Sequence, residues 1–364
     1  MLNIYKDKKV LITGHTGFKG SWLSIWLKSL QAKVYGLSLD VPTIPSHFEA
    51  AHLSDQIQDY RFNICDSEPL NKIIKDIEPD FIFHLAAQPL VRLSYDDPLN
   101  TITTNALGTA NILNSLRKIK KKVIAVMITS DKVYDNSEWV WGYREIDRLG
   151  GKDPYSASKG MAELVIKAFF NSYFTNSSTR IRIGIARAGN VIGGGDWASD
   201  RIIADCIKSW SKNKSVDIRN PDATRPWQHV LEPLSGYLTL GSSLYLNKNH
   251  NGQAYNFGPS ANQNYSVGQL INQMSKEWKG ASWNNMSNID KKVPEANLLK
   301  LNCDKALSEL KWSPVLSIHE TLRFTMDWYK YFYDNPKKDI FDFSLKQINQ
   351  YVDFAKKNKI NWAI

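Results

Sequence analysis

Two side chains with the right types and spacing for proton transfer lie in the stretch Asp153-Pro154-Tyr155-Ser156-Ala157-Ser158-Lys159. An aspartate followed by a proline is a common start of a helix, so Tyr155 and Lys159 are expected on one helical face, about one turn apart. A lysine ammonium beside a phenol lowers the phenol's pKa, and the phenolate can then take a proton from a hydroxyl. Alone, this spacing is common and usually describes a surface pair, so its significance depends on the other motifs in the chain.

A second polar group follows the apolar stretch 122–128, which is expected to be a buried strand. It reads Thr129-Ser130-Asp131-Lys132. Open parallel sheets bind their ligands at the carboxyl ends of the strands, where this group would lie. A polar loop exit would explain each of these residues alone, but it explains three in a row poorly. The stretch therefore predicts a functional site.

A glycine-rich turn near the N-terminus is typical of dinucleotide binding. A strand expected at 9–13 leads into Gly14-His15-Thr16-Gly17-Phe18-Lys19-Gly20, and a helix is expected to begin near Ser21. Glycine permits the tight turn, lets the backbone approach a pyrophosphate and allows the helix to pack closely on the strand. Free N–H groups at the start of the helix then face the anion. The glycines are weak evidence by themselves, but their place after a buried-type strand predicts a bound nucleotide.

The end of the second strand, expected at 33–39, is where such folds hold the adenosine ribose. Ser38 lies 24 residues after Gly14, and Asp40 follows two residues later. Either side chain can accept a hydrogen bond from a ribose 2′-hydroxyl, although Asp40 fits a simple loop opening equally well. No arginine stands beside them in the sequence, which favours NAD over NADP.

The remaining pattern predicts an α/β protein with a doubly wound, mostly parallel Rossmann sheet and a smaller C-terminal α+β lobe. The alternation of strands and helices breaks from Gly189 on, where we expect the chain to cross into the second lobe. We assign 1–188, with 230–257 returning, to the NAD-binding domain, and 189–229 with 258–364 to the substrate-binding lobe. Further strands are expected at 60–64, 80–85, 180–186 and 254–257, and helices at 98–118, 155–173, 201–212, 231–246, 267–278, 304–310 and 318–335.

Composition narrows the functional classes. The 364 residues carry a formal net charge of +10, but the lysines are scattered, apart from short clusters at 118–122 and 356–359. No basic stripe carries interleaved aromatics, so we expect no nucleic-acid partner and a surface that mildly favours anionic substrates. The sequence has no eighteen-residue apolar run and no signal-peptide pattern, so we expect no membrane partner. Cys65, Cys206 and Cys303 lie far apart, which predicts a cytoplasmic protein with no metal site.

With the glycine turn, the Tyr155/Lys159 pair and the strand end Ser130-Asp131-Lys132 together, the chain resembles the nucleotide-sugar 4,6-dehydratases of the extended short-chain dehydrogenase/reductase family. The resemblance runs from Val10 to about Tyr329. Dehydratases of the dTDP-glucose type carry T-D-E at this strand end. The S/T-D-K variant, the opening at 14–23 and the stretch R-P-W-Q-H-V at 225–230 resemble the branch that acts on CDP-glucose.

The resemblance implies a reaction that makes a 4-keto-6-deoxy sugar with NAD retained through the cycle. Tyr155 would take the proton of the C4 hydroxyl, and Lys159 would hold the ribose and lower the pKa of that tyrosine. Ser130 would orient the C4 hydroxyl, and Asp131 would protonate the departing C6 hydroxyl. The family's usual C5 base is a glutamate at position 132, where this chain has Lys132. A lysine serves as a base only when neutral, so Lys132 is a base, a group that stabilises the enolate charge, or a surface lysine.

The resemblance also assigns binding residues. Asn63 replaces an acidic residue that contacts the adenine, so this contact would lack its charge. Arginine suits a diphosphate because its planar fork pairs two oxygens. NAD would be contacted by Phe18 and Lys19 over the pyrophosphate and by Asn63, Ile64, Leu85, Ala86, Ala87, Gln88 and Thr104. The nucleotide sugar, CDP-glucose in the branch named above, would be held by Gln88, Ser130, Asn190, Arg201, Arg219 and Arg225.

Family members usually dimerise through two helices per subunit, here about 98–118 and 155–173, so we expect a homodimer or a dimer of dimers. Two other functions stay open. A nucleotide-sugar 4-epimerase shares Tyr155, Lys159 and the strand-end serine but needs no acid such as Asp131. An NAD-binding redox sensor or scaffold without turnover is the other, although such proteins tend to lose the Tyr/Lys pair. A 4,6-dehydratase acting on dTDP-glucose or GDP-mannose is a further alternative.

Overall fold

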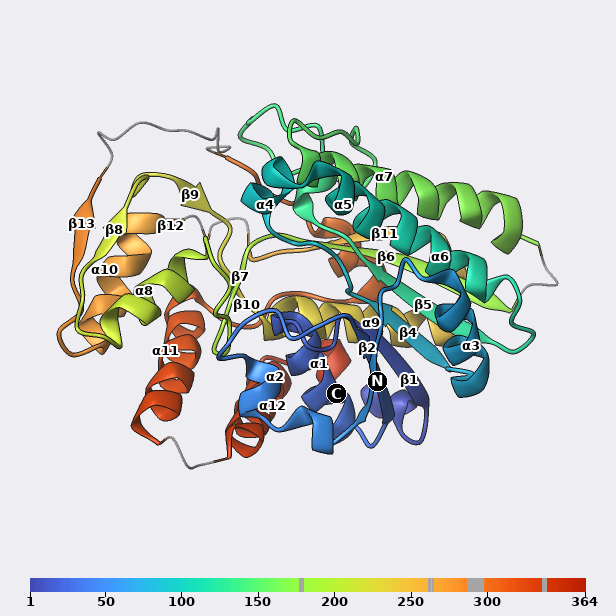
Figure 1. The fold of residues 1–364 in the computed structure, drawn as a ribbon, viewed down its shortest axis with the longest axis horizontal. Helices are drawn as coiled ribbons and strands as arrows, with labels where there is room; N and C mark the ends of the chain where they lie inside the picture. Colours follow the sequence, from blue (N-terminus) through green and yellow to red (C-terminus); the bar gives the residue numbers. More distant parts are fainter. Residues whose placement is uncertain (177–179, 261–262, 264, 287–297, 336–338) are drawn as a thin grey trace.

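The computed structural model describes residues 1–176, 180–260, 263, 265–286, 298–335 and 339–364. Its centre is a seven-stranded sheet in the order β11-β6-β5-β4-β1-β2-β3 (Figure 1). All neighbouring pairs are parallel, so the expected α/β sheet is confirmed, and it is parallel throughout. The strands are β1 (Lys9–Thr13), β2 (Lys33–Ser38), β3 (Gln58–Arg61), β4 (Phe81–His84), β5 (Val123–Ile128), β6 (Ile181–Ala188) and β11 (Ala254–Phe257).

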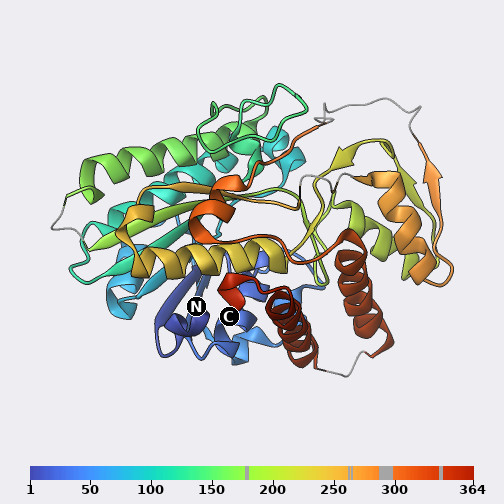
Figure 2. The same cartoon turned by 180° about the vertical axis from the view of Figure 1, so that it is seen from behind.

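Helices cover both faces of the sheet because its strands are apolar on both (Figures 1 and 2). In β1, Val10 and Ile12 join the core on one face, and Leu11 joins the core on the other, as the two-residue period of a strand requires. One face carries α1 (Phe18–Ser29), α9 (Leu231–Leu246) and α12 (Ile340–Lys357), and the other carries α3 (Ser67–Ile77), α6 (Gly108–Leu116) and α7 (Pro154–Phe169).

A smaller lobe lies at the left of Figure 1, built from helices and three two-stranded sheets, as the sequence predicts. Its helices are α8 (Ile202–Trp210), α10 (Val267–Glu277) and α11 (Ile318–Asp334). Its strand pairs are β7 (Val191–Ile192) with β10 (Gln228–His229), β9 (Thr224–Arg225) with β12 (Tyr265–Ser266), and β8 (Val216–Ile218) with β13 (Trp283–Asn285).

The segment after this lobe returns to the sheet. Helix α12 packs on α1, where the rings of Trp26 and Tyr351 lie 5.7 Å apart between centroids. The Tyr351 hydroxyl also donates to Glu232 Oε2 at 2.7 Å, which ties α12 to α9. Among the described residues, none of the helices combines the length and apolar character needed to cross a membrane.

Two element boundaries near the expected cofactor site differ from the sequence prediction. The third strand is β3, Gln58–Arg61, and not 60–64. The strand ends early because Asn63 turns the chain: its side-chain oxygen accepts from the Cys65 amide at 2.9 Å, and its carbonyl accepts from the Asp66 amide at 2.9 Å. The first helix begins at Phe18 and not near Ser21, because the Ser21 amide already donates to the carbonyl of Gly17 at 2.9 Å.

The helix expected at 98–118 is interrupted. It consists of α5 (Pro98–Ile102), a π-helical turn (Thr103–Leu107) and α6. The wide turn coincides with Asn105, whose side chain points inward and bonds the backbone of Gln88 and, at 2.8 Å, the hydroxyl of Ser158 on α7. Such turns often mark functional sites. Here the turn anchors the loop after β4 to the helix that carries the tyrosine and the lysine.

Candidate active site

The helix α7 presents Tyr155 and Lys159 to the carboxyl end of β5. It begins as expected, because Asp153 accepts from the Ser156 amide at 2.9 Å and Pro154 occupies the first turn. The two side chains are buried, with 8% of Tyr155 and 7% of Lys159 exposed. The pair is thus not on the open surface, which was the commonplace alternative for this spacing.

The strand end and α7 meet at Ser130. Its hydroxyl donates to Asp131 Oδ1 at 3.0 Å and accepts from the Lys132 amide at 3.2 Å. Ser130 also acts on the phenol of Tyr155, whose pKa it lowers. The structure therefore brings Tyr155, Ser130 and Asp131 together in one connected group, with Lys132 half-buried beside it.

Burial governs the protonation of this group. It raises the pKa of Tyr155, although Ser130 and Arg201 act in the opposite direction. The sequence predicted that Lys159 would lower the pKa of Tyr155. That prediction is wrong for the protein without ligands, because it did not include the cost of burying the charged phenolate. Burial also lowers the pKa of Lys159 to about 8, against the effect of Glu163, and raises the pKa of Asp131, against the effects of Lys132 and Ser130.

Lys19 reaches the same space from α1. Its Nζ lies 3.4 Å from the hydroxyl of Tyr237 on α9. Burial and the charge of Arg201 lower the pKa of Lys19 to about 8, while Asp131 and Asp196 raise it. Lys19, Arg201 and Asp131 therefore interact electrostatically. Sequence reasoning missed Tyr237 and Asp196, because no local motif marks either residue.

The glycine turn has the geometry that a dinucleotide requires. Gly14 has φ +79°, and a Cβ there would lie 2.7 Å from the amide nitrogen of Ala86. A Cβ on Gly20 would lie 2.1 Å from the carbonyl oxygen of Gly14, so the helix packs directly on the turn. Within the described residues, α1 has no side-chain cap at Gly17, which leaves the start of the helix suited to an anion.

At the adenosine end, the two ribose candidates differ in availability. The hydroxyl of Ser38 is buried and bonded to His15 Nδ1 at 2.9 Å and to the Thr16 amide at 3.3 Å. Asp40 is exposed, and its carbonyl accepts from the Thr16 hydroxyl. Strand pairing also places Arg61 opposite Ser38, a proximity that the sequence did not reveal; its guanidinium donates to Asp59 Oδ2 at 2.8 Å.

The other residues assigned to the cofactor line the same edge of the sheet. Leu85, Ala86 and Ala87 follow β4 and are half-buried. The side chain of Gln88 is held internally: its amide nitrogen donates to Thr101 Oγ1 at 2.9 Å, and its oxygen accepts from the Leu90 amide at 2.6 Å. Ile64 is buried beneath Gly108, Asn63 caps its own turn, and Thr104 lies in the π-helical turn.

The structure brings only some of the residues assigned to the nucleotide sugar close to Tyr155 and Asp131. Asn190 is half-buried just after β6, and Arg201 is half-buried at the start of α8, where its charge acts on Tyr155, Lys19 and Asp196. Arg225 lies half-buried in β9 and donates to the Thr224 carbonyl at 2.8 Å. Arg219 is exposed after β8, and its charge acts on Asp205.

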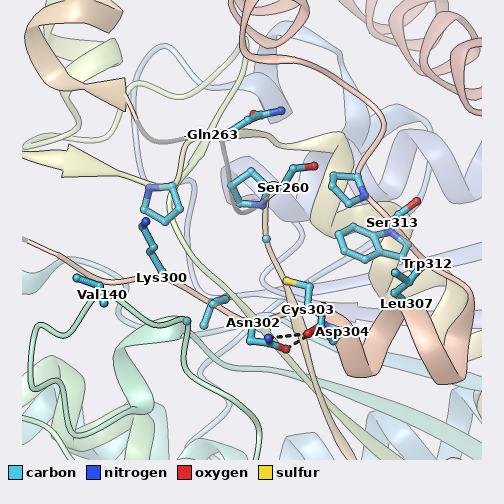
Figure 3. Close-up of a pocket in the computed structure, with 16 residues that line it drawn as sticks. Val140, Ser260, Gln263, Lys300, Asn302, Cys303, Asp304, Leu307, Trp312 and Ser313 are labelled. Carbon is cyan, nitrogen blue, oxygen red and sulfur yellow. Dashed lines mark hydrogen bonds between the residues drawn. The ribbon is translucent and has the colours of Figure 1, made fainter.

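A cavity of about 360 Å³ lies next to this site and has Pro226 in its wall. Pro226 borders Gly189, where an added Cβ would lie 3.7 Å from Pro226 Cγ and 2.8 Å from Asp131 Oδ2. Figure 3 shows that the walls come from separate segments, including Val140, Ser260, Lys300 and Trp312. None of the site residues predicted from the sequence lines this cavity. Its lining segments lie far apart in the sequence and come together only when the chain folds.

The structure combines a parallel sheet that has a glycine turn after its first strand with a helix whose tyrosine and lysine face a Ser-Asp strand end. This combination defines a short-chain dehydrogenase/reductase of the extended type. The chain belongs to the GDP-mannose 4,6 dehydratase family, whose sequence profile matches residues 11–325.

Individual relatives agree with this assignment. The chain is 47% identical over 332 residues to the CDP-glucose 4,6-dehydratase of Salmonella typhimurium, covering 90% of this chain and 92% of that protein. It is 23% identical over 337 residues to the UDP-glucose 4-epimerase of Mycoplasma pneumoniae, covering 90% and 98%. Among solved structures, the UDP-glucuronic acid 4-epimerase from Bacillus cereus, in complex with UDP-glucuronic acid and NAD, matches with a TM-score of 0.74 at 25% identity, covering 88% and 99%.

Proposed function

We propose that this chain is an NAD-dependent CDP-glucose 4,6-dehydratase that converts CDP-glucose to CDP-4-keto-6-deoxyglucose. The substrate is that of the Salmonella relative, which is 47% identical over nearly the full length. The observation that carries the reaction type is the buried carboxyl of Asp131, which accepts from Ser130 at 3.0 Å and acts electrostatically on Tyr155. A dehydratase needs both a base for the C4 hydroxyl and an acid for the C6 hydroxyl, whereas an epimerase needs only the first.

The residues present fit NAD. The uncapped start of α1 and the close approach of Gly14 to Ala86 suit the pyrophosphate, with Lys19 adding a cation nearby. We assign the adenosine ribose to Asp40, because the hydroxyl of Ser38 is already bonded to His15. NAD, when bound, would accept a hydride from C4 of the sugar and return it to C6. Lys159 would hold the nicotinamide ribose.

Three of the catalytic side chains have one proposed task each. Tyr155 takes the proton of the C4 hydroxyl, which Ser130 orients. Asp131 protonates the C6 hydroxyl as it leaves, and its buried site favours the protonated acid. Lys132 keeps two possible tasks, removal of the C5 proton or stabilisation of the enolate charge.

The lobe built from 189–229 and 258–335 would hold the nucleotide sugar through Asn190, Arg201 and Arg225. Arg219 is exposed, and its assignment to the substrate follows from the resemblance alone. We place α12 with the NAD-binding domain, because it packs on α1.

We propose a homodimer formed through α5, the π-helical turn and α7. These elements carry exposed apolar side chains that a partner subunit would cover, namely Leu99, Leu107, Met161 and Leu164. We place the protein in the cytoplasm, whose reducing conditions suit three unpaired cysteines.

The test is to incubate the purified protein with CDP-glucose, dTDP-glucose, UDP-glucose and GDP-mannose and to follow the ultraviolet chromophore of 4-keto-6-deoxy sugars in alkali. CDP-glucose should give the largest signal. No signal with any donor would refute the dehydratase. Asp131→Asn separates the 4-epimerase, because elimination should collapse in this variant and epimerisation should persist.

A further inference from the structure

Arg61 places a cation where this fold is expected to hold the adenosine ribose. Strand pairing sets Arg61 opposite Ser38, the last residue of β2, and the Phe62 amide donates to the Ser38 carbonyl at 3.1 Å. Residues paired in this way in a parallel sheet direct their side chains to the same face. In such folds the ribose lies at the end of the second strand, and an arginine nearby accommodates the 2′-phosphate of NADP. By position alone, Arg61 would favour NADP.

The guanidinium of Arg61 is already held by the protein. It donates to Asp59 Oδ2 at 2.8 Å, and it lies 4.9 Å from the ring centroid of Phe48 in α2 (His47–Ala50). The side chains of Arg61 and Asp59 are 31% and 17% exposed, so water and salt screen this ion pair less than a fully exposed one. A 2′-phosphate could use Arg61 only by competing with the carboxylate that already binds it.

Asp59 is fixed in turn by His15 of the glycine turn. Asp59 Oδ1 lies 2.9 Å from His15 Nε2, and His15 Nδ1 lies 2.9 Å from the Ser38 hydroxyl. Because a carboxylate only accepts hydrogen bonds, Nε2 donates to Asp59 and Nδ1 accepts from Ser38. Burial lowers the pKa of His15, so the ring is neutral near pH 7. The negative charge of Asp59 is therefore balanced by Arg61 and not by His15.

The charges around the ribose position do not favour a phosphate. Those of Arg61 and Asp59 cancel, and the carboxylate of Asp40, to which we assign the ribose, is exposed. A ribose 2′-hydroxyl can donate to Asp40, whereas a 2′-phosphate would bring negative charge beside it. We propose that Asp59 is a positioning residue that makes the site select NAD against NADP, by holding Arg61 and balancing its charge. This inference deepens the proposed NAD-dependent function and rests on it.

The test measures the binding of NAD and of NADP to the nucleotide-free, full-length chain by titration calorimetry. Asp59→Asn keeps an oxygen that can accept from His15 and turns an amide group, which cannot accept, toward Arg61. This variant should bind NADP roughly 10-fold more tightly than the wild type does, the effect of one charge-assisted hydrogen bond. Its affinity for NAD should stay unchanged. Asp76→Asn is the matched control, because it removes the same charge from an exposed position of α3, on the other face of the sheet.

Two further variants identify the group that binds the phosphate. Arg61→Ala added to Asp59→Asn should abolish the gain in NADP affinity, and Arg61→Ala alone should leave NADP affinity at the wild-type level. Thermal melts show whether each variant is folded.

Three results would overturn the inference: a folded Asp59→Asn protein with no gain in NADP affinity, a double variant that keeps the gain, or weaker NADP binding in Arg61→Ala alone. Failure of the proposed function would differ from all three, because the wild type would then bind neither cofactor and make no 4-keto-6-deoxy product.

Discussion

The guanidinium of Arg187 holds the carboxylate of Glu163 by two hydrogen bonds, one of them 2.7 Å from Nε to Oε1, and both side chains are completely buried. The same carboxylate accepts from the hydroxyl of Thr129 at 2.8 Å. Thr129 directly precedes Ser130, and Glu163 lies one helical turn beyond Lys159. One buried ion pair therefore fixes the two halves of the site relative to each other.

Glu163→Gln should lower the free energy of unfolding by about 3–5 kcal/mol, because it leaves the charge of Arg187 buried and unpaired. Denaturant titration measures the change. The matched control is Arg144→Ala, which breaks the pair between the exposed Arg144 and the half-buried Asp147 and should cost less than about 1 kcal/mol. If both variants lose the same free energy of unfolding, the buried pair stabilises the fold no more than a surface pair does.

Gly189→Ala should reduce kcat by roughly 10²-fold with an unchanged melting temperature. The added Cβ would lie 2.8 Å from Asp131 Oδ2, so the carboxylate must shift away from the leaving group. Steady-state kinetics and thermal melts check both parts. Gly258→Ala is the control, because its Cβ would meet Cys303 Sγ at an ordinary 3.4 Å. Full activity in Gly189→Ala would argue against Asp131 as the acid.

The contribution of Lys159 to the stability of the fold should rise with pH between about 8 and 10.5. Its pKa in the folded chain is about 8, below the ordinary 10.5, so the unfolded chain binds more protons in this window. Lys159→Met removes this contribution. Relative to the variant, the wild type should gain at most about 1.4 kcal/mol per pH unit. Unfolding titrations at several pH values measure the gain, and parallel curves would contradict a lowered lysine pKa.

Leu164→Arg should convert the proposed dimer to a monomer. In the single chain, 58% of Leu164 is exposed, so a partner subunit can cover it. An arginine at this position would place a charge in the buried interface. Light scattering after gel filtration should then give 41.5 kDa in place of about twice that mass. Leu246→Arg is the control, since this leucine is 66% exposed at the end of α9, away from α5 and α7. A variant that stays dimeric would place the interface elsewhere.

Local patterns predicted the parts of the site that the chain builds from neighbouring residues. The turn from Gly14 to Gly20 and the Tyr155/Lys159 pair depend on short-range spacing, and each lies in the element expected for it. The partners of these residues could not be found that way. Tyr237 reaches Lys19 from a helix far along the chain, and Glu163 meets Arg187 only after strand pairing.

Burial was the other effect that the sequence concealed. The pKa of Tyr155 depends on how much water is removed around the phenol, and spacing alone carries no such information. Likewise, Ser38 has the sequence spacing expected of a residue that binds the adenosine ribose. In the folded chain, however, its hydroxyl is hydrogen-bonded to His15.

The contact between Trp26 and Tyr351 also bears on how the protein is made. The glycine turn at 14–20 leaves the ribosome early. The helix α1 that follows it gains its packing against α12 only after residues 340–357 have been synthesised. Because contacts between distant segments form slowly, the newborn chain should bind NAD only after synthesis has passed this helix, and nascent chains stalled before residue 340 should fail to retain the cofactor.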